Sequence, residues 1–208
     1  MIVPEKFTVY TIGHSTHSAD YFISLLQTHG INALVDVRSQ PFSRYNPQFN
    51  KDALSSELKK SGIAYVFIGK ELGARSDDPA CYVDGHVQYD RLSQTSLFRT
   101  GIERVLEGAK RYRIALMCAE KEPLDCHRTV LVARSLEREG VTIQHILADG
   151  QLEDQKDTMS RLLDIVGLPQ EDMFHSHAQL VDDACRLREN KIAYVDEAHS
   201  EISERVEA

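Results

Sequence analysis

Apolar and polar positions alternate along this chain in two rhythms, one typical of strands and one typical of amphipathic helices. Short apolar runs that end at glycine or polar residues predict strands at Phe7–Ile12, Ala33–Val37, Ala64–Ile68, Ile114–Cys118 and Thr142–Leu147. Segments with helical spacing lie between and after them and predict helices over Ser18–His29, Asp52–Lys60, Ser96–Lys110, Pro123–Glu139 and Leu152–Val166. This alternation predicts an α/β fold, a three-layer sandwich with a mostly parallel, Rossmann-like sheet.

Two segments depart from the alternation. The stretch Gly69–Thr95 is polar with several aromatic residues, and loops of this length usually form lids over a site or are disordered. We expect it to be a flap. The chain beyond Gly167 holds a helix-like piece, Ala178–Glu189. We therefore expect an α/β domain over residues 1–167 that carries the site, and an extension over 168–208 that is an accessory helix, a dimer contact or partly disordered.

Composition and charge restrict the class of protein. No apolar stretch approaches the roughly 18 residues of a membrane span, so we expect no membrane partner. The four cysteines are irregularly spaced and no export signal is evident, which favours a cytoplasmic protein with reduced thiols. The whole net charge of −8 comes from residues 151–208, which hold 6 basic and 14 acidic side chains, because residues 1–150 are neutral overall. This balance argues against non-specific nucleic-acid binding but leaves room for a local basic pocket.

Polar residues follow the first two predicted strands, where ligands of a parallel sheet bind. Gly13, His14 and Ser15 end the first strand, and the helix start that follows suits a phosphate or carboxylate. Helix capping explains Ser15 equally well but does not require His14. Asp36 lies in an apolar run, where a carboxylate needs a partner, and Arg38 has the spacing to be that partner. Arg38 and Arg44 would together clamp an anion.

The richest stretch follows the fourth predicted strand. Cys118, Glu120, Cys126, His127 and Arg128 lie on one strand–loop–helix corner. The thiols can act as nucleophiles or as a redox pair, because a thiol near a helix N-terminus and a cation has a lowered pKa. They can bind a metal with His127. They can also simply pack, leaving Glu120, His127 and Arg128 as the polar groups. The metal hypothesis is the weakest, because C-x7-C-H matches no common zinc spacing and adjacent helical residues point about 100° apart.

Weaker candidates lie elsewhere. Arg75 and His86 lie in the long loop and can reach the site if that loop folds over it, and Tyr45 and Tyr82 can stack on a planar ligand. No glycine fingerprint for a dinucleotide and no P-loop is present, so neither a nicotinamide cofactor nor ATP has support. The cofactor therefore stays unassigned.

Three motifs, TIGHST, VDVRSQPFSR and CAEKEPLDCHR, occur here in that order. Together they resemble the signatures of the family called domain of unknown function 488, over about residues 7–150. The resemblance implies a compact α/β fold and a shared polar site, without an assigned reaction. It places the characteristic positions of the family on Gly13, His14, Ser15, Asp36, Arg38, Pro41, Ser43, Arg44, Cys118, Glu120, Cys126, His127 and Arg128.

We expect an enzyme, a hydrolase or transferase, that acts on an anionic, phosphate-bearing substrate such as a nucleotide or a nucleic-acid end. The expected catalytic residues are His14, Asp36, Cys118, Glu120, Cys126 and His127. The expected substrate-binding residues are Ser15, Arg38, Ser43, Arg44 and Arg128, and no metal ligand is assigned. The alternatives are a non-catalytic nucleotide or nucleic-acid binding module and a cysteine-based redox or metal-binding protein. The partners we expect are a small anionic substrate or nucleic-acid fragment, and a second copy in a homodimer.

Overall fold

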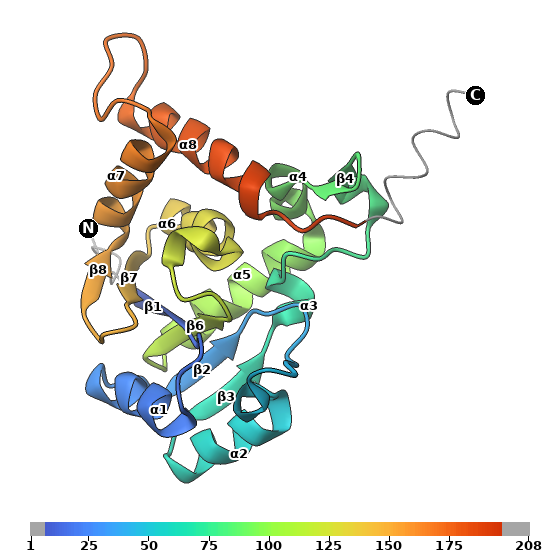
Figure 1. Ribbon diagram of the computed structural model, residues 1–208, viewed down its shortest axis with the longest axis vertical. Coiled ribbons are helices and arrows are strands. Elements are labelled where there is room, and N and C mark those ends of the chain that lie inside the picture. Colours follow the sequence, from blue (N-terminus) through green and yellow to red (C-terminus); the bar gives the residue numbers. More distant parts are fainter. Residues whose placement is uncertain (1–6, 197–208) are drawn as a thin grey trace.

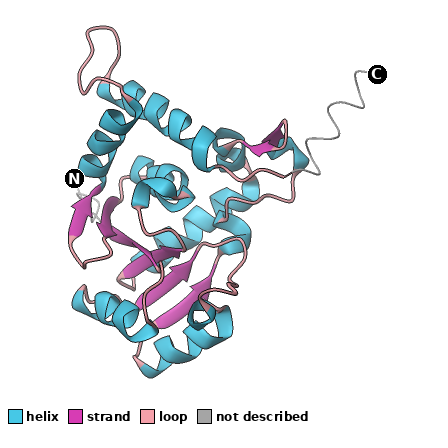
Figure 2. Ribbon diagram, in the orientation of Figure 1, coloured by secondary structure: helices cyan, strands magenta, loops and turns pink. Residues whose placement is uncertain are grey.

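The computed structural model describes residues 7–196 and has a mixed, six-stranded central sheet (Figures 1 and 2). The strand order is β3-β2-β6-β1-β7-β8. Five strands run parallel, and the edge strand β8 pairs antiparallel to β7. The strands span β1 Thr8–Gly13, β2 Ala33–Asp36, β3 Ala64–Phe67, β6 Ile114–Cys118, β7 Thr142–Ile146 and β8 Leu152–Asp154. The predicted α/β sandwich with a mostly parallel, Rossmann-like sheet is confirmed.

Helices cover both faces of the sheet, because the central strands are apolar on both sides and must be buried on both. On one face lie α1 Ala19–Thr28 and α2 Lys51–Lys60, whose leucines pack on Tyr10, Ile12 and Met117. On the other face lie α5 Ser96–Ala109, a π-helix over Arg128–Ala133 and α6 Arg134–Arg138. Figure 1 shows the sheet between these two layers.

The strand order puts the three motif-bearing strands side by side. β6 lies between β2 and β1, and the register pairs Gly13 with Cys118 and Asp36 with Met117. Because these strands are parallel, the residues that follow each of them emerge at one edge of the sheet. The candidate chemistry of three distant segments is therefore gathered at the centre of that edge.

Three predicted segments differ from the structure. The expected flap Gly69–Thr95 contains regular elements: α3 Gly69–Leu72, a short hairpin of β4 Tyr82–Val83 and β5 His86–Val87, and α4 Tyr89–Gln94. The last helix of the body, α7 Gln155–Val166, begins later than expected, because residues 152–154 pair with β7 as β8. The helix expected over Pro123–Glu139 is interrupted at Cys126, which is extended between a 3-10 turn and the helix that follows it.

The C-terminal extension packs on the α/β body within the described residues. Helix α8, His177–Ile192, begins with a capping box at Ser176 and buries Leu180, Val181 and Ala184 against α7 and Leu124. Beyond it, Val195 bridges to His86 of β5. Residues 197–208, the rest of the extension, lie outside the described residues. The expectation of partial disorder falls on them. Across residues 7–196, no helix has the length and hydrophobicity needed to cross a bilayer.

Candidate active site

Backbone hydrogen bonds extend the sheet past the strand ends and tie the motif loops together. The N–H groups of His14 and Ser15 donate to the carbonyls of Cys118 and Ala119, each at 2.9 Å. Gly13 has no side chain at the closest point: a Cβ there would lie 1.9 Å from the carbonyl oxygen of Glu120. The glycine of the first motif is thus needed because the loop after β6 packs directly on it.

Asp36 and Arg38 form a closed ion pair under the site. Arg38 donates from Nε to Asp36 Oδ1 at 2.9 Å and from Nη2 to Oδ2 at 2.7 Å, and Nη2 also donates to the Phe49 carbonyl at 2.8 Å. The Tyr65 hydroxyl donates to Oδ2 at 2.7 Å. Burial, with the Asp36 charge second, raises the pKa of Tyr65, which keeps this hydroxyl protonated. The hydrogen bonds from Arg38 and Tyr65 thus occupy both oxygens of the buried carboxylate.

His14 is buried and holds Arg38 from the other side. Its Nδ1 donates to the Ser15 carbonyl at 2.8 Å, its Nε2 accepts from Arg38 Nη1 at 3.2 Å, and its ring stacks on Phe49 at 4.3 Å between centroids. Burial is the main cause that lowers the pKa of His14 to about 4, and the Arg38 charge also lowers it. His14 is therefore neutral near pH 7 and acts as a positioning group for Arg38, with both ring nitrogens occupied.

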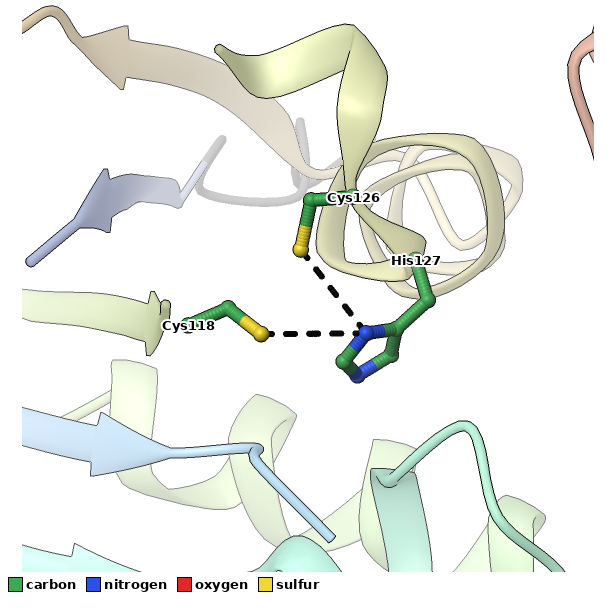
Figure 3. A group of neighbouring side chains, drawn as sticks. All are labelled: Cys118, Cys126 and His127. Atoms are coloured by element: carbon green, nitrogen blue, oxygen red, sulfur yellow. Dashed lines mark hydrogen bonds between the residues drawn. The ribbon is translucent and has the colours of Figure 1, made fainter. Parts of the chain in front are cut away.

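The corner after β6 differs from the expected continuous helix. Residues Pro123–Asp125 form one 3-10 turn, and Cys126 then adopts an extended conformation with φ −136° and ψ 138° before the chain re-enters a helix at His127. The prediction that Cys126 and His127 point apart as helical neighbours is therefore wrong. Because Cys126 is extended, both side chains turn toward Cys118 (Figure 3).

The thiol–imidazole cluster, defined here as Cys118, Cys126 and His127, is compact and buried. The sulfur atoms of Cys118 and Cys126 lie 3.8 Å and 3.7 Å from Nδ1 of His127, and all three atoms lie within 4.8 Å of one another. The other ring nitrogen, Nε2, donates to the Val37 carbonyl at 3.2 Å. The backbone N–H of Arg128 donates to the Cys126 sulfur at 3.4 Å.

The charges around the cluster favour one ionised sulfur. Burial opposes ionisation of Cys126, but a hydrogen bond from the Cys118 thiol and the positive charges of Arg128 and His127 lower its pKa well below the usual value. The same contact with Cys126, together with burial, raises the pKa of Cys118. Burial also opposes the charge on His127, yet the sulfur of Cys126 raises its pKa. By itself, the cluster is best described as a Cys126 thiolate, a Cys118 thiol and a proton on His127.

The cluster forms the floor of a cavity of about 290 Å³, which we call the thiol pocket. Glu120 stands at its exposed rim, but the protein surrounding its inner side raises the pKa of its carboxyl by desolvation, and the Cys126 sulfur raises it further. Arg38 and Arg75 line the walls. The remaining lining comes from Ser39, Gln40, Phe42, Ala74, Tyr89, Ala119, Asp125, Ile192 and Tyr194.

A second cavity, of about 340 Å³, adjoins the first, and the two share Arg38, Gln40, Phe42 and Ala119. This hydroxyl pocket is lined in addition by His14, Ser15, Thr16, Ser43, Asn46 and Lys121. Ser15 adopts a left-handed conformation with φ 49°, an unusual one for a non-glycine residue that is held here by its hydrogen bond to Ala119. Arg38 thus lies between two pockets that open at the same sheet edge.

The three arginines expected to bind the substrate do not converge. Arg38 borders both pockets, whereas Arg44 is exposed and lies outside them. Arg128 is fully buried beneath Gly13, where Nη1 donates to the Glu120 carbonyl at 2.7 Å while Nε and Nη2 have no hydrogen-bond partner. Its charge acts on the thiolate of Cys126 rather than on a substrate.

Several pocket residues come from segments with weak sequence signals. The sequence marks Arg75 only by its place in the long loop. In the structure its backbone N–H donates to Ser39 Oγ at 3.1 Å, and this hydrogen bond attaches the loop to the site. Sequence reasoning misses Ile192 and Tyr194, since they lie far along the chain and have no polar motif around them. His86 lies outside the pocket in the β4–β5 hairpin, which the segment after α8 contacts.

Comparison with known proteins gives one match. No curated protein and no solved structure matches the chain significantly. A family model matches residues 18–135, more than half of the chain. This range contains the second and third motifs, while TIGHST lies just before it. The chain belongs to the family described as domain of unknown function DUF488.

Proposed function

We propose that the protein is an enzyme, a hydrolase or a transferase, that acts on a small anionic substrate in the thiol pocket. One observation carries this proposal: two thiols, an imidazole, two carboxyl groups and two guanidinium groups line a single cavity. A pocket that only binds an anion needs the guanidinium groups. It does not need a buried thiol–imidazole cluster on its floor.

The walls of the pocket suit an anionic, phosphate-bearing ligand. Arg38 uses four of its five N–H groups within the protein and keeps one on Nη1 for a ligand. Arg75 is exposed at the rim and adds a second positive charge. Phe42, which is 67% exposed between the two pockets, offers an apolar surface to a planar group. A nucleotide or the end of a nucleic-acid strand has all the complementary features.

The reaction would take place between the floor and the rim of the pocket. The anionic group is held by Arg38 and Arg75, and its reacting atom faces the thiol–imidazole cluster. The cluster provides the nucleophile, either the Cys126 thiolate or a water molecule held there. Glu120 lies on the same cavity and transfers the proton to or from the substrate. His14 and Asp36 act indirectly, by fixing Arg38.

A substrate screen with a matched pair of variants tests this proposal. Mononucleotides and 5′- or 3′-phosphorylated oligonucleotides are incubated with the protein, and products are identified by mass spectrometry. Glu120→Gln should lower turnover by about a hundredfold or more. Glu103→Gln, an exposed carboxylate on α5 outside the thiol pocket, should leave turnover unchanged. A ligand that binds stoichiometrically and is recovered unchanged would favour a binding module and overturn the enzyme proposal.

A further inference from the structure

The thiol–imidazole cluster has an arrangement that hydrogen bonds alone explain poorly. Nε2 of His127 carries the proton donated to Val37, so Nδ1 has one lone pair or one proton for its contacts with sulfur. Two sulfur atoms nevertheless approach Nδ1 at nearly equal distances of 3.7 and 3.8 Å. With Nδ1 protonated in the metal-free cluster, its single proton cannot be donated to both sulfurs at full strength, whereas a single cation between the three atoms would satisfy all of them.

The distances fit a tetrahedral metal ion of the zinc class. Bonds of about 2.3 Å to sulfur and about 2.05 Å to nitrogen, at tetrahedral angles, place sulfur and nitrogen about 3.6 Å apart and two sulfurs about 3.8 Å apart. The sulfur–nitrogen separations here are within about 0.2 Å of this value, and the two sulfurs lie within 4.8 Å of each other. Two thiolates and an imidazole are ligands that favour zinc over magnesium or calcium.

We infer that Cys118, Cys126 and His127 bind one zinc ion through the two Sγ atoms and Nδ1. Binding releases two protons to solvent, one from the Cys118 thiol and one from Nδ1 of His127, and the two thiolates balance the charge of the ion. The sequence spacing does not indicate this site, because on a continuous helix the adjacent side chains of Cys126 and His127 would point about 100° apart. The extended backbone at Cys126 brings them together.

The groups around the ligands match an outer shell of a metal site. A metal-binding histidine usually donates its second ring N–H to a carbonyl or carboxylate, which fixes the tautomer and the ring orientation. Val37 provides that carbonyl for His127. The N–H of Arg128 donates to the sulfur of Cys126, as expected for a thiolate ligand at a helix start.

The three ligands leave the fourth position of the ion toward the thiol pocket, which all three line. Three protein ligands with an open position are typical of catalytic rather than structural zinc. A water molecule there would be the nucleophile of the proposed reaction, with Glu120 on the same cavity to handle its proton. This catalytic part rests on the proposed function. Metal binding itself does not.

Metal content tests the site without any substrate. The full chain is purified without chelator and analysed by inductively coupled plasma mass spectrometry, and we expect about one zinc per chain. Cys118→Ser, Cys126→Ser and His127→Gln should each lower bound zinc at least tenfold. Cys185→Ser, which changes a thiol that lies outside the thiol pocket and beside Met159, should keep it.

Cobalt gives a second measurement on the wild-type chain, which remains informative if a ligand variant fails to fold. Chelator-treated protein given Co²⁺ should show a thiolate-to-cobalt absorption and the intense visible bands of a tetrahedral site, and zinc should displace both. Protein with no zinc and no cobalt bands would overturn the inference. In that case, loss of turnover in Glu120→Gln would still support an enzyme that uses the Cys126 thiolate. A chain with zinc but no turnover would instead keep the metal site and overturn the proposed function.

Discussion

Arg38 is held by Asp36, two residues before it in the chain, through a two-point ion pair whose oxygen–nitrogen distances are 2.9 and 2.7 Å. The backbone N–H of Arg38 also donates to Asp36 Oδ1 at 3.1 Å, so the pair closes a short ring at the end of β2. Asp36 is fully buried and Arg38 nearly so. The guanidinium therefore has one fixed position between the two pockets.

Asp36→Asn should lower the free energy of unfolding by about 3 to 5 kcal/mol, because it leaves the buried guanidinium of Arg38 without a charge partner. Urea denaturation followed by circular dichroism measures the change. Glu57→Gln, which breaks the solvent-exposed pair with Lys60, serves as the control and should have little effect. Equal losses in the two variants would mean that the buried pair does not stabilise the fold as its geometry indicates.

Gly13→Ala should be more damaging than its size implies, because the new Cβ would meet the Glu120 carbonyl at 1.9 Å and force the two motif loops apart. We expect a loss of about 3 kcal/mol or more in unfolding free energy. Gly140→Ala is the matched comparison: that glycine has a φ of +84° but nothing within 4 Å of the added carbon, and should cost only about 1 kcal/mol. If both cost the same, contact between the loops does not explain Gly13.

The sequence predicted the five parallel strands and the edge at which their polar residues meet, because hydrophobic periodicity is a local signal. It could not predict which strands are neighbours, because the position of β6 between β2 and β1 depends on non-local packing.

The sequence also could not predict that the side chains of Cys126 and His127 both lie beside Cys118. Pro123 is compatible with a first helical turn, and only the tertiary contacts of the corner select the extended backbone at Cys126. The pocket wall at Tyr194 lies beyond α8 and no motif marks it. The composition of the thiol pocket was thus predictable for the three motif loops and not for the segments that cover them.

His145 is buried between β1, β7 and α7, away from the thiol pocket, and is hydrogen-bonded on both ring nitrogens. Thr11 Oγ1 donates to Nδ1 of His145 at 2.7 Å, and Nε2 of His145 donates to Gln155 Oε1 at 2.6 Å. One neutral tautomer satisfies both contacts. Burial is the main cause that lowers the pKa of His145 to about 4, and the charges of Arg128 and Arg161 lower it further. The Gln155 hydrogen bond and the charge of Glu153 oppose this shift without cancelling it.

This neutral histidine predicts acid sensitivity. The unfolded chain binds a proton at His145 below the ordinary histidine pKa of 6.5, while the folded chain does so only below a pKa of about 4. Stability from this group is therefore complete above pH 6.5 and falls by about 3 kcal/mol as the pH drops to 4. Unfolding free energies of the wild type and His145→Gln, measured from pH 4 to 7.5, should differ by an amount that follows this curve. A difference that does not vary with pH would contradict a neutral buried His145.

Arg75 should contribute to substrate affinity rather than to the chemical step. Its guanidinium carbon lies 4.3 Å above the ring of Tyr194, which holds this exposed side chain over the thiol pocket. Arg75→Gln removes one charge-assisted hydrogen bond to the anion and should raise KM about tenfold with kcat nearly unchanged. Tyr194→Ala, which frees the guanidinium without removing it, should have a smaller effect in the same direction. Arg44→Gln changes an exposed arginine outside both pockets and should leave KM unaltered. Steady-state kinetics on the substrate found in the screen decides the matter, because equal KM values for Arg75→Gln and Arg44→Gln would place the anion elsewhere.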